Sequence, residues 1–160
     1  MPTPADPLRL HLVRLLDWEE AHVGFDRAVA EVPDELRGTV PVGFQYSAWQ
    51  LVEHLRLAQK DLLDFCVNPG YVHTLAWPDD YWPRDPAPAE GAWAASLAEI
   101  VRDREALQAV VRDPGVDLFG LVPAGTGDQT VLRAVLLVAD HAAYHVGQLV
   151  ALRRALGCWP

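Results

Sequence analysis

Apolar residues recur every three or four positions in four long segments of this chain, which is the spacing of amphipathic helices. The first segment runs from about Asp6 to Ala30, and the second runs from Ser47 to Asn68. The third runs from about Gly91 to Arg112, and the fourth runs from about Asp128 to Leu156. No segment alternates apolar and polar residues as a half-buried strand does. The pattern therefore predicts an all-α protein.

Capping signals support the ends of these helices. Asp6 is a suitable N-cap, and Pro7 after it suits the first helical position. Ser47 and Gln50 have the spacing of a capping box, in which each side chain binds the other residue's backbone N–H. Gly157 is a suitable C-terminal stop. Four such helices in a chain of 160 residues predict one four-helix-bundle domain over residues 1–160.

The connection between the second and third helices is unusually long. It spans residues 68–90, and loops of this length are functional or disordered. Four aromatic residues favour an ordered loop that packs across one end of the bundle: Tyr71, Trp77, Tyr81 and Trp82. These side chains either cover a pocket or only anchor the crossover, and the sequence leaves both roles open.

Charge and composition narrow the function classes. The chain has 13 basic and 22 acidic residues, and its net charge is −9. An acidic surface repels phosphate backbones, so nucleic acid is not an expected partner. No basic amphipathic stripe favours a membrane surface, and no apolar run reaches the roughly 20 residues that cross a bilayer.

The two cysteines, Cys66 and Cys158, form neither a CxxC motif nor a disulfide framework, which indicates a reducing compartment. The N-terminal residues lack the basic start and apolar run of a signal peptide. We therefore expect a soluble, cytoplasmic protein.

Two histidines stand on the apolar face of the fourth helix. His141 and His145 are four residues apart, so both rings lie on one side of the helix and could bind one metal ion. His54 is the best third ligand, because Leu51 and Ala58 place it on the inward face of the second helix. Three histidine ligands leave other metal positions open, which is typical of catalytic sites. The alternative is that all three are hydrogen-bonded packing residues.

The histidine pair is not the HExxH motif of zinc peptidases. Ala142 follows His141, so the glutamate that acts as general base in those enzymes is missing. Asp140 and Glu53 each precede a histidine and are therefore turned about 100° away from it. Peptide hydrolysis is accordingly not favoured.

Other residues near these motifs have weaker functional readings. His22 shares a helix face with His11 and Trp18 if the first helix is continuous, and it is then a candidate pocket residue. Tyr144 is a candidate for lining the pocket or a helix interface. Packing or solvent exposure is the default for the remaining ones: His11, Trp49, His73, Cys66 and Cys158.

Three motifs together resemble one family. The segments WQLVEHLRLAQ and DHAAYHVGQLVALRR, with the crossover WPDDYWP between them, resemble the DinB-like (DinB/YfiT) superfamily of small metal-binding bundles. The resemblance implies a four-helix bundle of up-down-down-up topology and frequent homodimers. It also implies a divalent transition metal, zinc or nickel, on His54, His141 and His145.

The resemblance further implies a metal-dependent thiol S-transferase that joins a low-molecular-weight thiol, such as bacillithiol or mycothiol, to a small electrophile. Metal chemistry agrees, since a bound divalent ion deprotonates a coordinated thiol without a protein base. Two other functions stay open: a metal-dependent hydrolase of a small substrate, and a bundle that binds metal or a small ligand without catalysis. The sequence identifies no catalytic side chain beyond the metal ligands.

Overall fold

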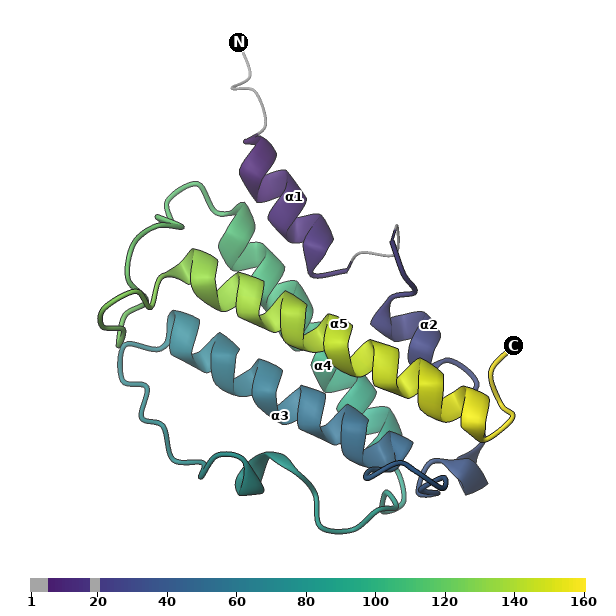
Figure 1. Cartoon of the computed structure of the whole chain (residues 1–160). Coiled ribbons are helices and arrows are strands. Elements are labelled where there is room, and N and C mark those ends of the chain that lie inside the picture. The colour runs from purple at the N-terminus through teal and green to yellow at the C-terminus, as the bar shows by residue number, and fades with distance from the viewer. Residues whose placement is uncertain (1–5, 18–20) are drawn as a thin grey trace.

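Three long helices make up most of the helical structure. The computed structural model describes residues 6–17 and 21–160. Its long helices are α3 (Ala48–Val67), α4 (Ala92–Arg112) and α5 (Val131–Ala155), and α3 packs against both of the others. Figure 1 shows α3 and α5 lying side by side with α4 behind them. Over the described ranges there is no strand, only an isolated bridge between Leu121 and Thr130, so the all-α prediction is confirmed.

The predicted caps explain where the long helices begin and end. Ser47 Oγ accepts the Gln50 N–H at 3.1 Å and Gln50 Oε1 accepts the Ser47 N–H at 3.1 Å, which confirms the capping box. At the other end of the chain Gly157 stops α5, with a φ of 70° that favours glycine. α5 begins three residues later than predicted. Thr130 stays extended in its bridge to Leu121, and its Oγ1 accepts the Arg133 N–H.

The first predicted helix is wrong as a continuous element. The structure has two short helices in its place, α1 (Pro7–Leu15) and α2 (Phe25–Val29). Asp6 and Pro7 begin α1 as predicted, but Gly24 has an extended backbone and begins α2 as a separate helix. The face that His11 was expected to share with His22 therefore does not exist. Trp18, the third residue of that face, lies outside the described residues.

The short N-terminal helices cover the long ones. α1 packs mainly on α4, and α2 packs on α5. Between α2 and α3 lies a one-turn helix, η1 (Asp34–Leu36). The core gathers around Leu149 and Leu152 of α5, which are 0% exposed, and Val52 of α3. Trp49 is 8% exposed in the same cluster, as its packing assignment expected.

The crossover of residues 68–91 is ordered, but it does not pack across one end of the helices. It runs back alongside α3, so that α4 begins near the end at which α3 begins (Figure 1). A single turn within it, η2 (Asp79–Tyr81), contacts α3, and Tyr81 is 3% exposed. This course places the aromatic residues of the crossover against the middle of α3, where His54 lies.

One helix is more apolar than the sequence analysis expected. By length and composition alone α5 could cross a membrane, and 39% of its most apolar window is buried inside the structure. Core helices of soluble proteins meet the same criterion, and the buried face of α5 here packs against α3 and α2. The apolar character of α5 is therefore accounted for in part by this packing.

The core assignment predicts a contrast between two leucines of α5. Leu149→Ala should lower the free energy of unfolding by about 3 kcal/mol, because it leaves a cavity at a fully buried position. Leu136→Ala should lower it by less than about 0.5 kcal/mol, because Leu136 is 45% exposed. Urea unfolding followed by circular dichroism measures both. Equal losses for the two variants would contradict the packing described here.

Candidate metal centre

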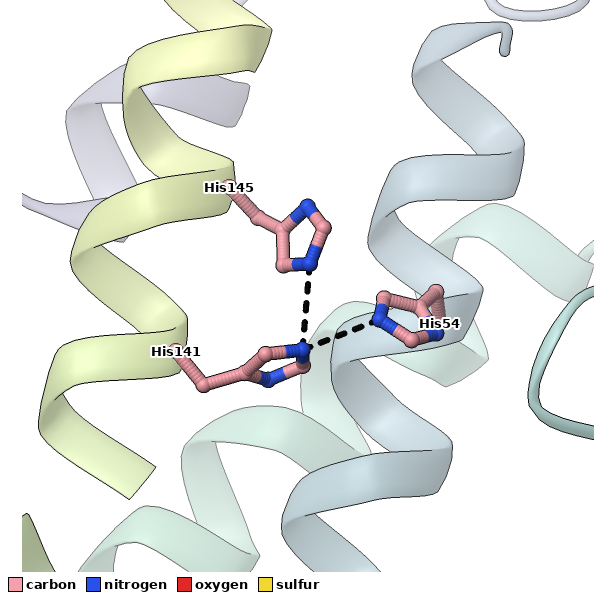
Figure 2. Close-up of side chains that lie close together, drawn as sticks. All are labelled: His54, His141 and His145. Atoms are coloured by element: carbon pink, nitrogen blue, oxygen red, sulfur yellow. Dashed lines mark hydrogen bonds between the residues drawn. The ribbon is translucent and has the colours of Figure 1, made fainter. Parts of the chain in front are cut away.

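Three histidines from two helices meet between α3 and α5. His54 lies on α3 and is 2% exposed, while the buried His145 and the partly buried His141 lie one turn apart on α5. Figure 2 shows the three rings pointing toward one another across the gap between the helices. The structure thus brings together the three residues that the sequence analysis selected as a ligand set.

The Nε2 atoms of the three rings converge. His141 Nε2 lies 2.9 Å from His54 Nε2 and 3.0 Å from His145 Nε2 (Figure 2). One nitrogen from each ring lies within 4.8 Å of the others. Two imidazoles bound to one ion at 2.0–2.1 Å have nitrogens about 2.9–3.4 Å apart, for bond angles between right-angled and tetrahedral. The two separations from His141 Nε2 fit this range.

The other ring nitrogens of two histidines are occupied. His54 Nδ1 lies 3.0 Å from the backbone oxygen of Tyr81, and His145 Nδ1 lies 2.7 Å from Gln148 Oε1. An oxygen of this kind only accepts, so each Nδ1 carries the proton and donates it. Each Nε2 is then left with a lone pair, which is the tautomer a metal ligand needs.

With these tautomers the Nε2 atoms of His54 and His145 are both hydrogen-bond acceptors, and the cluster has too few N–H donors for them. The lone pairs of His54 and His145 both face His141 Nε2, and a neutral His141 has at most one proton to donate from that atom. A cation at the point where the three Nε2 atoms meet would satisfy all of them at once. The donor set, three neutral imidazole nitrogens, suits a divalent transition metal such as zinc or nickel.

Aromatic residues of the crossover hold the ring of His54. Trp82 stacks on it with ring centres 3.8 Å apart and planes 3° apart, and Tyr46 stacks in turn on Trp82 at 3.7 Å. The stacking fixes the tilt of the imidazole, and the hydrogen bond from its Nδ1 to the Tyr81 carbonyl fixes its rotation. The crossover aromatics therefore do more than anchor a loop, because they orient a candidate ligand.

Burial keeps the histidines neutral. Removal from water, together with the charge of neighbouring histidines, lowers the pKa of His54 and of His141 from 6.5 to about 4. The hydrogen bond to the Tyr81 carbonyl acts in the opposite direction on the pKa of His54. Burial also lowers the pKa of His145, although its bond to Gln148 acts in the opposite direction. Neutral imidazole is the form that binds metal, so the site is prepared for a cation at neutral pH.

The carboxylates next to the histidines in sequence make other contacts. Glu53 accepts from Arg56 at 2.9 Å and from Ser96 at 2.6 Å, and so faces α4. Asp140 is exposed. Neither belongs to the group of metal-ligating side chains found over the described residues. The structure thus offers neither of them as a base beside the histidines.

Of the two weaker candidates, His22 lies away from the three histidines and Tyr144 lies beside one of them. His22 is exposed and lines a separate cavity of about 280 Å³ with Ala142 and Val146, which face a different side of α5. Tyr144 is 65% exposed, and its ring centre lies 5.0 Å from that of His145. Each of the other histidines outside the cluster, His11 and His73, is exposed.

Sequence reasoning missed the groups that orient the ligands. Gln148 follows His145 by three residues on the same helix, a spacing that signals a side-chain contact. Asp61 follows His54 by seven residues and accepts the Tyr81 hydroxyl at 2.6 Å, which ties the crossover to α3. The Tyr81 carbonyl left no signal, because every residue carries a backbone oxygen.

Comparison with known proteins identifies the family. The sequence pattern of the DinB superfamily matches residues 17–149. The chain belongs to the DinB superfamily. The chain shows no significant match to a curated protein or to a solved structure. Membership and the three-histidine group together fit a metal-binding protein, and the identity of the metal is left to experiment.

The site predicts a specific pattern of metal binding. Purified protein should bind close to one divalent transition metal per chain, measured by elemental analysis. His54→Ala, His141→Ala and His145→Ala should each weaken zinc binding at least 100-fold in chelator competition, because each removes one of three ligands. His11→Ala should change it by less than threefold, since His11 is exposed on α1. Full affinity in any ligand variant would remove that residue from the set.

The lowered pKa values predict how acid affects the metal-free protein. The unfolded chain takes up protons on these imidazoles below about pH 6.5, whereas His54 and His141 stay neutral in the native state down to about pH 4. Stability present above about pH 6.5 is therefore lost as pH falls toward about 4. Urea midpoints at pH 7 and at about pH 5.5 should show this loss. The fall of the urea midpoint between these two pH values should be smaller in His141→Gln than in the wild type, and it should be unchanged in His11→Gln. An equal fall in the wild type and both variants would contradict the prediction.

Proposed function

We propose that this member of the DinB superfamily is a metal-dependent thiol S-transferase that acts on small electrophiles. The observation that carries the proposal is the convergence of three Nε2 atoms, with two of the tautomers set by Tyr81 and Gln148. A zinc or nickel ion held there would make a coordinated thiol a nucleophile at neutral pH. The protein binds and orients the reactants, while the thiol's proton passes to solvent and its sulfur displaces the leaving group.

The surroundings of the histidines favour thiol transfer over hydrolysis. A metal-dependent hydrolase commonly pairs its metal with a carboxylate that accepts a proton from water. Glu53 is engaged by Arg56 and Ser96 here, and Asp140 is exposed. Asp61 is linked to His54 through Tyr81, and each of its carboxylate oxygens already accepts a tyrosine hydroxyl. A thiol needs no such base once it is coordinated.

The wider architecture of the family belongs to the same proposal. α1 packs on α4 and α2 packs on α5, so the two short helices together cover the surface that one N-terminal helix of an up-down-down-up four-helix bundle would cover. Homodimerisation, a cytoplasmic location and a low-molecular-weight thiol as partner stay predictions. Native mass spectrometry tests the first of them directly.

Thiol-dependent turnover is the decisive measurement. Zinc- or nickel-loaded protein should accelerate conjugation of 1-chloro-2,4-dinitrobenzene with one of a panel of thiols, including bacillithiol, mycothiol, glutathione and cysteine. The rate should fall at least 100-fold after chelation or in His54→Ala, and it should recover when metal is restored to the wild type. His11→Ala is the matched control and should keep full activity.

Two results would overturn the proposal. One is turnover that persists unchanged after complete chelation, since the metal would then not take part. The other is ester hydrolysis that needs the metal but no thiol, which would assign the site to the hydrolase class. Metal binding without turnover of any thiol or ester would also contradict the proposal and would indicate a protein that binds metal without catalysis.

A further inference from the structure

A small cavity lies directly beside His141. It has a volume of about 200 Å³ and is bounded by α3, the crossover and α5. Its walls are mainly apolar and come from Ala58, Leu62, Trp77 and Leu137. Because His141 forms part of the wall, a molecule in this cavity would lie next to the converging histidines. His22 does not line it.

The size of the cavity limits its ligand. An apolar cavity of about 150 Å³ holds benzene, whereas pockets for drug-sized ligands measure about 300–1,000 Å³. About 200 Å³ is therefore room for one six-membered ring or a short branched alkyl group. A nucleotide or another large cofactor would not fit within it, and apolar walls favour a group that gains from leaving water.

The one charged side chain in the wall is Asp61. Its Oδ1 accepts the Tyr71 hydroxyl at 2.8 Å and its Oδ2 accepts the Tyr81 hydroxyl at 2.6 Å. Burial and Asp61 raise the pKa of both tyrosines, so both remain neutral donors. Over the described residues the only ion-pair partner of Asp61 is His73, at 4.0 Å and only if protonated.

In the metal-free protein this arrangement holds a negative charge at the cavity wall without a strong cation beside it. The two hydroxyls hold the carboxylate in one position, and an anionic ligand in the cavity would be repelled by it in a medium of low dielectric constant. Uncharged ligands meet no such penalty. The charge therefore selects against carboxylates and phosphates.

Trp77 forms an exposed part of the cavity wall. Its side chain is 67% exposed although it is one of the largest apolar groups in the chain, and its ring centre lies 5.2 Å from that of Tyr81. A ring or alkyl group in the cavity would cover part of the exposed indole and gain apolar contact. The exposed Trp77 is thus accounted for by a ligand that it helps to bury.

We propose that this cavity binds the electrophile as a small, uncharged, largely apolar molecule, and that Asp61 disfavours anionic ones. The inference rests on the proposed function only in naming the ligand as the electrophile. Binding itself depends on the cavity walls, so it is measurable without metal and without turnover.

Fluorine NMR of two matched probes tests the proposal. In metal-free protein, 4-fluorotoluene should bind at least tenfold more tightly than 4-fluorobenzoate, which has the same ring and a negative charge. In Asp61→Asn this difference should narrow to threefold or less. Cobalt-loaded protein should relax the fluorine signal of bound 4-fluorotoluene more than zinc-loaded protein does, because the probe lies beside the metal.

Two neighbouring leucines provide the matched variants. Leu137→Trp should fill the cavity and weaken 4-fluorotoluene binding at least tenfold. Leu136→Trp places the same bulk one residue away, outside the cavity wall, and should leave binding within twofold. Trp77→Ala should weaken binding severalfold at an exposed loop position, which keeps the test valid if Leu137→Trp does not fold.

The outcomes separate this inference from the proposed function. Equal binding of the two probes, equal effects of the two leucine variants or no probe binding would each overturn the cavity assignment. Probe binding with the expected pattern in a protein that binds no metal would support the cavity and overturn only the S-transferase.

Discussion

The hydrogen bond between His54 Nδ1 and the Tyr81 carbonyl is the contact on which the site depends. It joins the middle of α3 to a crossover residue 27 positions away, and it decides which nitrogen of His54 faces α5. The Tyr81 hydroxyl then donates to Asp61, two helical turns further along α3. One buried tyrosine thus orients a candidate ligand through its backbone and holds the cavity's carboxylate through its side chain. Loss of the crossover would disturb both.

Burial gives the three histidines their chemistry. In water an imidazole is half protonated near pH 6.5, but here the pKa of His54 and of His141 lies at about 4. The rings are therefore neutral, and the Nε2 atoms of His54 and His145 both face His141 Nε2. That atom has at most one proton to donate, so at least one acceptor is left without a donor. Acceptors so placed are unfavourable for the protein alone, and two outer hydrogen bonds hold them there. That combination is characteristic of a site arranged for a cation.

The same helices that position the ligands also limit what can reach them. Glu53 turns toward α4, where Arg56 and Ser96 bind it, so α3 presents an imidazole to the gap and no free carboxylate beside it. One approach is the cavity lined by Leu62, Leu137 and Trp77, which reaches His141. Its apolar walls and the Asp61 charge distinguish ligands by polarity, while the histidines define where reaction would occur. The three histidines and these wall residues all lie within residues 17–149, which match the DinB superfamily.

Local and tertiary information contributed differently. Helical periodicity and the Ser47–Gln50 capping box determined α3, α4 and α5 from the sequence, because these signals act within one or two turns. The i,i+4 spacing of His141 and His145 and the inward position of His54 pointed for the same reason to the candidate ligand set that the structure brings together. Only the tertiary structure decided that the predicted first helix is interrupted before Gly24 and that His22 lines another cavity. It also decided that the Tyr81 backbone oxygen accepts a hydrogen bond from His54. Those outcomes depend on how distant segments pack, and no short-range pattern encodes them.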